Sequence, residues 1–347
     1  MFLYFITFLL TVLAYIFIRR KRYDLSNEHC LITGGTSGIG LALAIECAKL
    51  GASVTILARG KSGTPGLDKE ESDFTDPKKT SDLTKKKSLG TAKKIISSYT
   101  KNNAQKILTF SVDITSEDAN LKDIIAEAET NCGPVTFLFN CAGTSISKRF
   151  EDSSIQDFKD MLNVNYLGSV SVTQAVLPAM KERCKGKIIF VSSLAGLIGL
   201  YGYTAYSASK FALVGLAEAL QMEMKPYNIG VTVSFPPDTA TPGYAEEMKT
   251  KPIETAKISE SGGLYEAEIV ARKTLYDVLD NKFMSSVGLE GWMLCVACSG
   301  TTPVNSIFQL LIQVATTGLM RLGLYIYLLQ CDQTIKKCFK ERELKKN

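Results

Sequence analysis

Six apolar, β-branched segments alternate with amphipathic ones, and this alternation limits the fold of the 347-residue chain more than any other feature. The apolar segments are 29–35, 52–58, 106–114, 134–143, 186–193 and 229–237. Strands that are apolar on both faces and alternate with helices form parallel sheets covered by helices on both sides. The pattern therefore predicts an α/β fold with a doubly wound parallel sheet.

A glycine-rich turn, 33–40, lies between the first predicted strand and an amphipathic helical segment, 41–51. Glycines let the backbone turn tightly and approach a pyrophosphate, which the free N–H groups at a helix N-terminus attract. A glycine triplet alone is a weak signal, but its place at the first strand-to-helix turn makes it specific. We predict a Rossmann-type dinucleotide site whose cofactor-binding residues include Gly34, Thr36, Ser37, Gly38, Ile39 and Gly40.

The end of the second predicted strand indicates which dinucleotide binds. An NAD-specific site usually places an acidic residue there, whereas this chain has Ala58 and Arg59. A guanidinium can pair with the 2′-phosphate of NADP, so we predict NADPH; the alternative is that Arg59 is a solvated strand end. The polar segment 60–90 that follows is predicted to be a mobile surface insertion, in which Lys61 and Lys69 are candidate helpers.

Tyr206 and Lys210 are predicted to form the reactive pair. They are four residues apart at the start of a helical segment, so they share a face. An ammonium near a tyrosine stabilises its phenolate and moves its pKa toward neutral pH. Ser193 lies thirteen residues upstream, at the end of a predicted strand, where its hydroxyl can bond a substrate carbonyl. Ser192 is adjacent, so the choice between the two serines stays open.

These motifs resemble those of the short-chain dehydrogenase/reductase family over roughly residues 26–285. The matching motifs are the turn at 33–40, Asp113 in SVDIT, Asn140 in NCAG, Asn165 in NVNYLG, Ser193, and Tyr206 with Lys210. The resemblance implies that Tyr206 is the acid/base, that Ser193 polarises the carbonyl and that Lys210 binds the nicotinamide ribose. It also implies adenine contact by Asp113, support of the cofactor strand by Asn140, and a relay water held by Asn165. Pro236 to Thr239 depart from the family pattern.

Longer stretches, such as 191–233 and 235–255, are similar to the members of this family that reduce a long-chain sphingoid ketone. That resemblance implies NADPH-dependent reduction of 3-oxosphinganine at the endoplasmic reticulum. It also suggests dimers or tetramers formed through the helix that carries Tyr206. The alternatives are a membrane-bound reductase of a steroid, retinoid or other lipid ketone, and a catalytically silent membrane scaffold.

Residues 1–18 carry no charge, Pro or Gly and would span about 27 Å as a helix. A secretory signal peptide would place basic residues before the apolar run, whereas Arg19 to Arg22 follow it. We therefore predict an uncleaved N-terminal membrane anchor, with the rest of the chain in the cytosol.

The charge pattern agrees with a membrane partner and not with nucleic acid. Of the net charge of +5, Arg19 to Arg22 contribute +4 and residues 336–347 contribute +4, so the rest of the chain sums to −3. An apolar region, 292–329, is predicted to be a membrane-associated helical hairpin or an interfacial helix, followed by a basic tail, 330–347. The alternative is a buried helix pair of the soluble fold.

Two further predictions concern the remaining polar residues. Nine scattered cysteines and a single histidine, His29, favour reduced thiols and no metal site, although Cys295 and Cys298 form an isolated C-x-x-C. The segment 239–265 falls where a substrate lid would close. Its Glu246, Glu247 and Glu254 are candidates to meet a substrate ammonium; the alternative is a solvated helix face.

Overall fold

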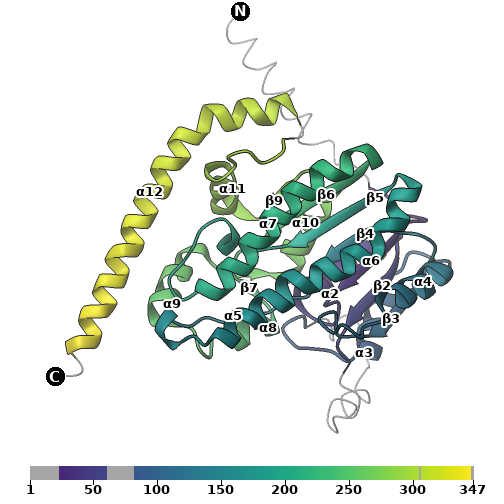
Figure 1. The fold of residues 1–347 in the computed structure, drawn as a ribbon, viewed down its shortest axis with the longest axis horizontal. Coiled ribbons are helices and arrows are strands. Elements are labelled where there is room, and N and C mark those ends of the chain that lie inside the picture. Colours follow the sequence, from purple (N-terminus) through teal and green to yellow (C-terminus); the bar gives the residue numbers. More distant parts are fainter. Residues whose placement is uncertain (1–22, 61–81, 305, 345–347) are drawn as a thin grey trace, which may run out of the picture.

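The computed structural model describes residues 23–60, 82–304 and 306–344. Its centre is a seven-stranded sheet with the order β3-β2-β1-β4-β5-β6-β9, in which all neighbouring strands are parallel (Figure 1). The strands are β1 (His29–Thr33), β2 (Ser53–Ala58), β3 (Ile107–Ser111), β4 (Val135–Asn140), β5 (Gly186–Val191), β6 (Ile229–Phe235) and β9 (Met284–Ser286). The predicted Rossmann-type, doubly wound sheet is confirmed, and β1 lies at its switch point between β2 and β4.

Strand β9 was not among the six predicted strands. It has three residues, two of them serines, and so short a polar segment carries no strand pattern. Its position depends on pairing with β6, where Met284 lies opposite Val233. Ser285 also donates a hydrogen bond of 2.8 Å to the buried Asp277.

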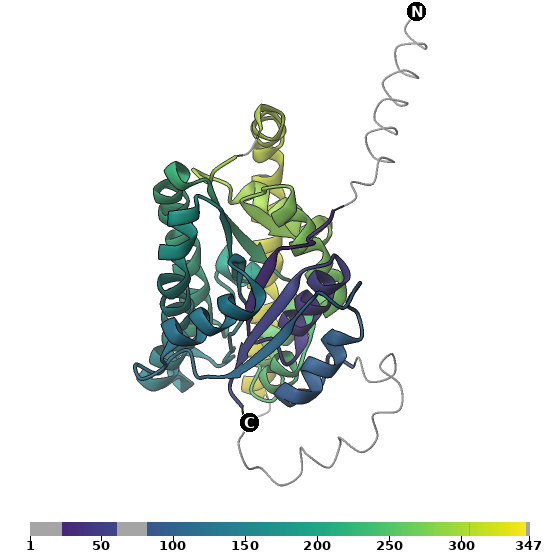
Figure 2. The same ribbon diagram turned by 90° about the vertical axis from the view of Figure 1, so that its right-hand side faces the viewer.

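Helices cover both faces of the sheet (Figure 2). One face packs against α2 (Gly38–Lys49), α3 (Leu89–Ser97) and α10 (Ala267–Leu279), and the other against α4 (Leu121–Cys132), α6 (Gly168–Arg183) and α7 (Thr204–Met224). Alternate residues of β1 enter opposite cores, because successive side chains of a strand point to opposite faces. Cys30 and Ile32 therefore lie in the first core and Leu31 in the second.

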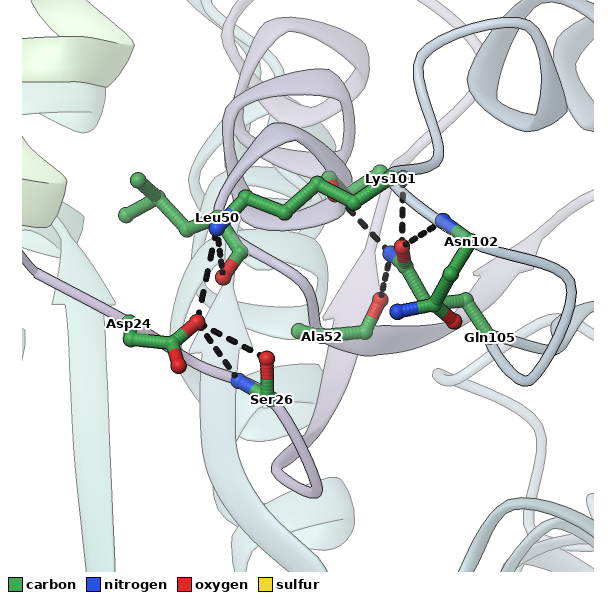
Figure 3. Close-up of polar contacts among 8 residues, drawn as sticks. Asp24, Ser26, Leu50, Ala52, Lys101, Asn102 and Gln105 are labelled. Carbon is green, nitrogen blue, oxygen red and sulfur yellow. Dashed lines mark hydrogen bonds and ion pairs between the residues drawn. The ribbon is translucent and has the colours of Figure 1, made fainter.

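The chain enters the described structure at the amino edge of the sheet, and polar contacts hold it there (Figure 3). Asp24 accepts hydrogen bonds from Ser26, and the Lys101 ammonium lies 3.4 Å from Asp24 and 3.1 Å from the Leu50 carbonyl oxygen. The Gln105 amide donates to the backbone oxygens of Ala48 and Ala52. These contacts hold the start of the described chain against the loops at the amino edge of the sheet.

Two helices follow the last strand, α11 (Gly288–Ala297) and α12 (Ile307–Leu344). Helix α12 packs on α11 and on α9 (Ile253–Ser259) and runs along one side of the body (Figure 1). It is long and apolar enough to cross a membrane by length and composition. It also continues through most of the segment predicted as a basic tail. The predicted membrane anchor, 1–18, lies outside the described residues.

Candidate active site

A cavity of about 770 Å³ opens at the carboxyl edge of the sheet. Its walls come from the turn after β1, from the ends of β2, β5 and β6, and from helices α11 and α12. A crevice outside the carboxyl ends of the strands is the usual ligand site of an open α/β sheet. The cavity contains nearly all of the predicted site residues, as the following paragraphs describe.

The glycine turn forms the wall of the cavity next to α2. Gly34 and Gly38 have φ angles of 69° and 52°, a region that side chains disfavour. A Cβ added at Gly40 would meet the Gly34 carbonyl oxygen at 2.5 Å, so only glycine allows this close turn. Ser37 is the N-cap residue of α2, and its side chain makes no capping bond. With Thr36 and Ile39, these residues line the cavity at a helix N-terminus, and they fit the diphosphate of a dinucleotide.

Arg59, at the end of β2, lies at the same cavity wall as Asp113, which follows β3. Asp113 accepts hydrogen bonds from the hydroxyl and N–H of Thr115, at 2.7 and 3.0 Å. These bonds, together with the charge of Arg59, lower the pKa of the Asp113 carboxyl. The carboxylate is therefore ionised and fixed in place at neutral pH.

Residues 82–90, the last part of the predicted insertion, pack against the glycine turn. The Leu83 carbonyl oxygen accepts a bond from the Gly38 N–H, and the Lys87 N–H donates to Thr36. Lys86 lines the cavity and was missed as a site residue. The run of three lysines before α3 was the only sequence signal for it. The candidate helpers Lys61 and Lys69 lie outside the described residues.

Asn140 does not line the cavity. It is buried at the end of β4, and its amide donates to the Thr173 hydroxyl of α6 at 3.1 Å. The next two residues, Cys141 and Ala142, donate their N–H groups to the Thr33 hydroxyl of β1. These bonds hold the ends of β1 and β4 together, and Cys141 and Ala142 form cavity wall between them.

Ser193, Tyr206 and Lys210 meet at one end of the cavity. Ser193 and Tyr206 both line the cavity, and hydrogen bonding by Ser193 lowers the pKa of the Tyr206 hydroxyl. The Lys210 Nζ lies 5.7 Å from the centre of the Tyr206 ring. Lys210 also donates to the Val191 carbonyl oxygen at 2.9 Å, which fixes α7 to the end of β5. Ser192 is buried, and its hydroxyl donates to the Lys210 carbonyl oxygen at 3.0 Å. The geometry therefore places Ser193, and not Ser192, beside the tyrosine.

Burial, and not the lysine charge, is the largest influence on the Tyr206 hydroxyl. It raises the pKa of Tyr206; the Ser193 hydrogen bond opposes this increase, and the charges of Glu247 and Asp238 add to it. Burial also lowers the pKa of Lys210 to about 8, because the ammonium has no carboxylate partner. The expected stabilisation of the phenolate by Lys210 is thus outweighed by desolvation of both groups in this structure.

Asn165 lies in a π-helical segment, Asn163–Leu167, between α5 (Ile155–Leu162) and α6. Its side chain accepts from the Thr144 N–H at 2.8 Å and donates to the Thr144 carbonyl oxygen and to the Ser209 hydroxyl. A Cβ built on Gly143 would lie 3.0 Å from the Asn165 Oδ1 and 3.4 Å from the Lys210 Nζ. The π turn, which the sequence did not indicate, therefore brings Asn165 next to the lysine.

The segment 239–265 covers the cavity with β7 (Thr239–Ala240), α8 (Pro242–Glu247) and α9. Of its three candidate acids, Glu247 is buried and lines the cavity. Glu246 also lines the cavity, but it pairs with Lys249 and its side chain is 71% exposed. Glu254 pairs with Arg342 of α12 and does not line this cavity. The structure therefore separates Glu247 from the other two.

Helices α11 and α12 supply an apolar part of the wall that we did not predict. It includes Met293, Leu294 and Ala297 of α11 and Met320, Leu324 and Tyr327 of α12. The spacing of 320, 324 and 327 is that of one helix face, but the same pattern occurs on any packed helix. Its role depends on where α12 lies in the fold, which sequence spacing does not indicate.

A family model and several known proteins are similar to this chain. The family model described as short chain dehydrogenase matches residues 80–252. A 3-dehydrosphinganine reductase of Danio rerio is 46% identical over 94% of this chain and 91% of its own length. A 3-ketodihydrosphingosine reductase of Bos taurus is 43% identical over 94% of this chain and 90% of its own length.

More distant proteins share the same features. A 3-dehydrosphinganine reductase of Arabidopsis thaliana is 37% identical over 97% of this chain and 94% of its own length. The crystal structure of levodione reductase superimposes with a TM-score of 0.62 at 20% identity, covering 78% of this chain and 98% of that one, which supports the fold alone. The chain therefore belongs to the short-chain dehydrogenase family, whose members are oxidoreductases with a nicotinamide cofactor.

Proposed function

We propose that this protein reduces the ketone of 3-dehydrosphinganine to the secondary alcohol of sphinganine, a step of sphingolipid synthesis. The observation that carries the proposal is that Ser193 and Tyr206 line one cavity together with apolar residues of α11 and α12. A hydroxyl pair suits a ketone oxygen, and an apolar wall suits a long alkyl chain. The relatives at 43–46% identity carry this substrate in their names.

The cavity residues suggest NADPH as the cofactor. Ser37 and the glycines of the turn would hold the diphosphate at the N-terminus of α2. Arg59 and Lys86 would face the 2′-phosphate, and Asp113 would contact the adenine. When bound, the nicotinamide supplies the hydride that adds to the ketone carbon.

The protein's own groups handle the oxygen and its proton. Ser193 would donate a hydrogen bond to the ketone oxygen and so polarise the carbonyl. As the carbon accepts the hydride, Tyr206 would donate its proton to the oxygen, which gives the alcohol and leaves a phenolate. Lys210 would bind the ribose and stabilise that phenolate. With Asn165 adjacent, it would return a proton from solvent to the tyrosine.

We further propose that α12 lies at the membrane surface with one face in the lipid. Its outer face is apolar and exposed at Leu311, Val314, Leu319, Leu322 and Ile326. Its opposite face forms cavity wall, so a lipid substrate can move from bilayer to cavity around this helix. The last turns carry Lys336, Lys337 and Lys340, which suit anionic headgroups. We propose that this membrane is that of the endoplasmic reticulum, with the catalytic domain on its cytosolic side.

Tryptophan fluorescence can test this placement, because Trp292 is the only tryptophan in the chain. In a Trp292→Phe background, Leu322→Trp places a probe on the outer face of α12 and Leu324→Trp places one on the cavity side. Brominated phospholipids should quench the probe at 322 strongly and the probe at 324 weakly. Equal quenching of both, as around a helix surrounded by lipid, would contradict the interfacial placement.

The domain division and the oligomer also remain proposals. The proposed domains are an anchor at 1–18, a reductase domain at 26–285 and a membrane-associated region at 292–329. Self-association would use α7, whose Phe211 and Met222 side chains are exposed. Cross-linking of the detergent-solubilised protein, compared with a Met222→Glu variant, would test that interface.

The activity itself is tested with membranes that contain the full chain. We expect oxidation of NADPH in preference to NADH with 3-dehydrosphinganine, and its loss in Tyr206→Phe. A steroid ketone and retinal serve as comparison substrates. Turnover of only the steroid ketone or retinal would support a reductase but would overturn 3-dehydrosphinganine as its substrate. Full activity of Tyr206→Phe would overturn the catalytic assignment.

A further inference from the structure

We propose that Glu247 recognises the protonated amine of the substrate and thereby makes the enzyme selective for amino ketones. The inference rests on the proposed function and deepens it, because it identifies which part of the sphingoid head is read. Three sets of observations carry it: the position of Glu247 beside the reactive tyrosine, its remaining hydrogen-bonding capacity and the charge balance around it.

The substrate's covalent structure limits where the amine can lie. The carbon that bears the amine is bonded directly to the ketone carbon, so the ammonium must lie next to Ser193 and Tyr206. Tyr203 connects Glu247 with the region around Tyr206, because the Tyr203 hydroxyl donates a hydrogen bond to the Glu247 carboxylate. The Tyr203 and Tyr206 rings are 5.4 Å apart between centroids. After burial itself, the charge of Glu247 contributes most to raising the pKa of Tyr206, so its field reaches the reactive hydroxyl.

The Glu247 carboxylate has room for another donor. Its Oε1 accepts from Tyr203 and from Lys251, whose Nζ lies 3.1 Å away. Its Oε2 accepts from the Ser145 hydroxyl at 2.5 Å. A carboxylate can accept about four hydrogen bonds. Oε2 can therefore accept a further bond from a ligand ammonium in the cavity that both Ser145 and Glu247 line.

The charges around Glu247 favour a cationic ligand. Lys251 is bonded to Asp238 at 3.2 Å as well as to Glu247, so one lysine serves two carboxylates. Burial raises the pKa of Asp238; the charge of Lys251 opposes this increase, and repulsion from Glu247 adds to it. An uncompensated charge in a buried site is costly. An ammonium beside Glu247 would balance it.

The other acids near the cavity are less suited to this role. Glu246 extends toward solvent and bonds Lys249 through both carboxylate oxygens. Glu290, on α11, lies on an exposed part of the wall. Neither influences the pKa of Tyr206. Asp238 does influence it and also lines the cavity, but burial raises the pKa of its own carboxyl and its Oδ2 is paired with Lys251, so it is less suited than Glu247. Glu247 is therefore the carboxylate that the geometry assigns to the amine.

The experiment compares kcat/KM for 3-dehydrosphinganine and for the same hydroxy ketone without its amine. The wild-type full chain should prefer the amino ketone, and Glu247→Gln should reduce that preference by about tenfold or more, because a charge-assisted hydrogen bond is lost. Turnover of the amine-free ketone should remain, which also shows that the variant is folded. Glu246→Gln removes the same charge from the same helix and should keep the wild-type preference.

Each other outcome is informative. An equal loss of turnover for both ketones in Glu247→Gln would show a merely structural role and overturn the inference. An unchanged preference would also overturn it. Reduction of neither ketone by the wild-type chain, with turnover of retinal or a steroid ketone, would instead overturn the proposed function.

Discussion

Ser192 and Ser193 are adjacent at the end of β5, but their side chains have different contacts. Successive side chains of an extended chain point to opposite sides, so Ser192 and Ser193 cannot both face the cavity in the same way. Ser192 turns toward the backbone of α7, where it donates to the Lys210 carbonyl oxygen. Ser193 turns toward Tyr206. Their substitutions should therefore have different consequences.

Ser193→Ala is expected to lower kcat about 10²-fold, because it removes a donor to the oxygen where negative charge develops. Ser192→Ala is expected to lower the free energy of unfolding by about 1 kcal/mol through its lost hydrogen bond, with kcat nearly unchanged. Steady-state kinetics and urea denaturation of both variants provide the check. The reverse pattern would assign the substrate contact to Ser192.

Lys210 leads to a pH prediction for the protein without cofactor. Burial lowers its pKa to about 8, below the unfolded value of 10.5. Between pH 8 and 10.5 the unfolded chain binds more protons than the folded chain. The contribution of Lys210 to the free energy of unfolding is therefore lowest below pH 8 and rises as the pH increases. Lys210→Met should therefore be more stable than wild type at pH 7. Thermal unfolding in detergent should show that the difference in stability between Lys210→Met and wild type becomes smaller from pH 7 to pH 9.5. A constant difference would contradict this prediction.

At the level of elements, α12 has two faces with different neighbours. Leu324 lines the cavity, whereas Leu322, two residues earlier, is 55% exposed on the outer face. The helix therefore combines a substrate wall with an apolar outer surface. A side chain enlarged on one face should affect only the function of that face.

Leu324→Trp should raise KM for the long-chain ketone about tenfold or more, because the larger ring overfills the space for the alkyl chain. A short-chain ketone with the same head should be affected little. Leu322→Trp is the matched control and should leave KM for both ketones unchanged. Equal effects of the two variants would remove α12 from the substrate wall.

At the level of the whole molecule, one ion pair fastens the end of α12 to the reductase body. Arg342 pairs with Glu254, whose side chain is 2% exposed, and Lys257 lies 3.5 Å from Glu341 beside it. These residues are far apart in the sequence, so the contacts fix α12 across α9. Glu254 thus serves attachment of the helix instead of the ammonium binding considered from sequence.

Arg342→Met should lower the free energy of unfolding by about 2 kcal/mol, because it leaves a buried carboxylate without its partner, while the part-exposed arginine limits the loss. Adding Glu254→Gln should recover most of that loss, since the carboxylate charge is then absent. A double-mutant cycle by urea denaturation in detergent measures the coupling. Additive effects of the two substitutions would mean that the ion pair contributes nothing.

The sequence by itself determined the sheet, the glycine turn and the position of Tyr206 and Lys210 on one helix. The alternation of strands and helices depends on local apolar patterns. The turn at 33–40 needs glycine at position 40, because residue 40 packs against the Gly34 carbonyl oxygen. Tyr206 and Lys210 share a helix, so their relation is also local. Such features can be predicted because neighbours along the chain are neighbours in space.

Only the tertiary structure decided the features that join distant segments. The pairing of β9 with β6, the different contacts of Ser192 and Ser193, and the contact of Lys86 with the cavity depend on packing between separate elements. Glu247 differs from Glu254 in its partners: Tyr203 and Lys251 contact Glu247, whereas Arg342 of α12 pairs with Glu254. These partners lie on other elements or turns. Burial and charge at a site are sums over all groups that surround it, and that surrounding exists only in the folded chain.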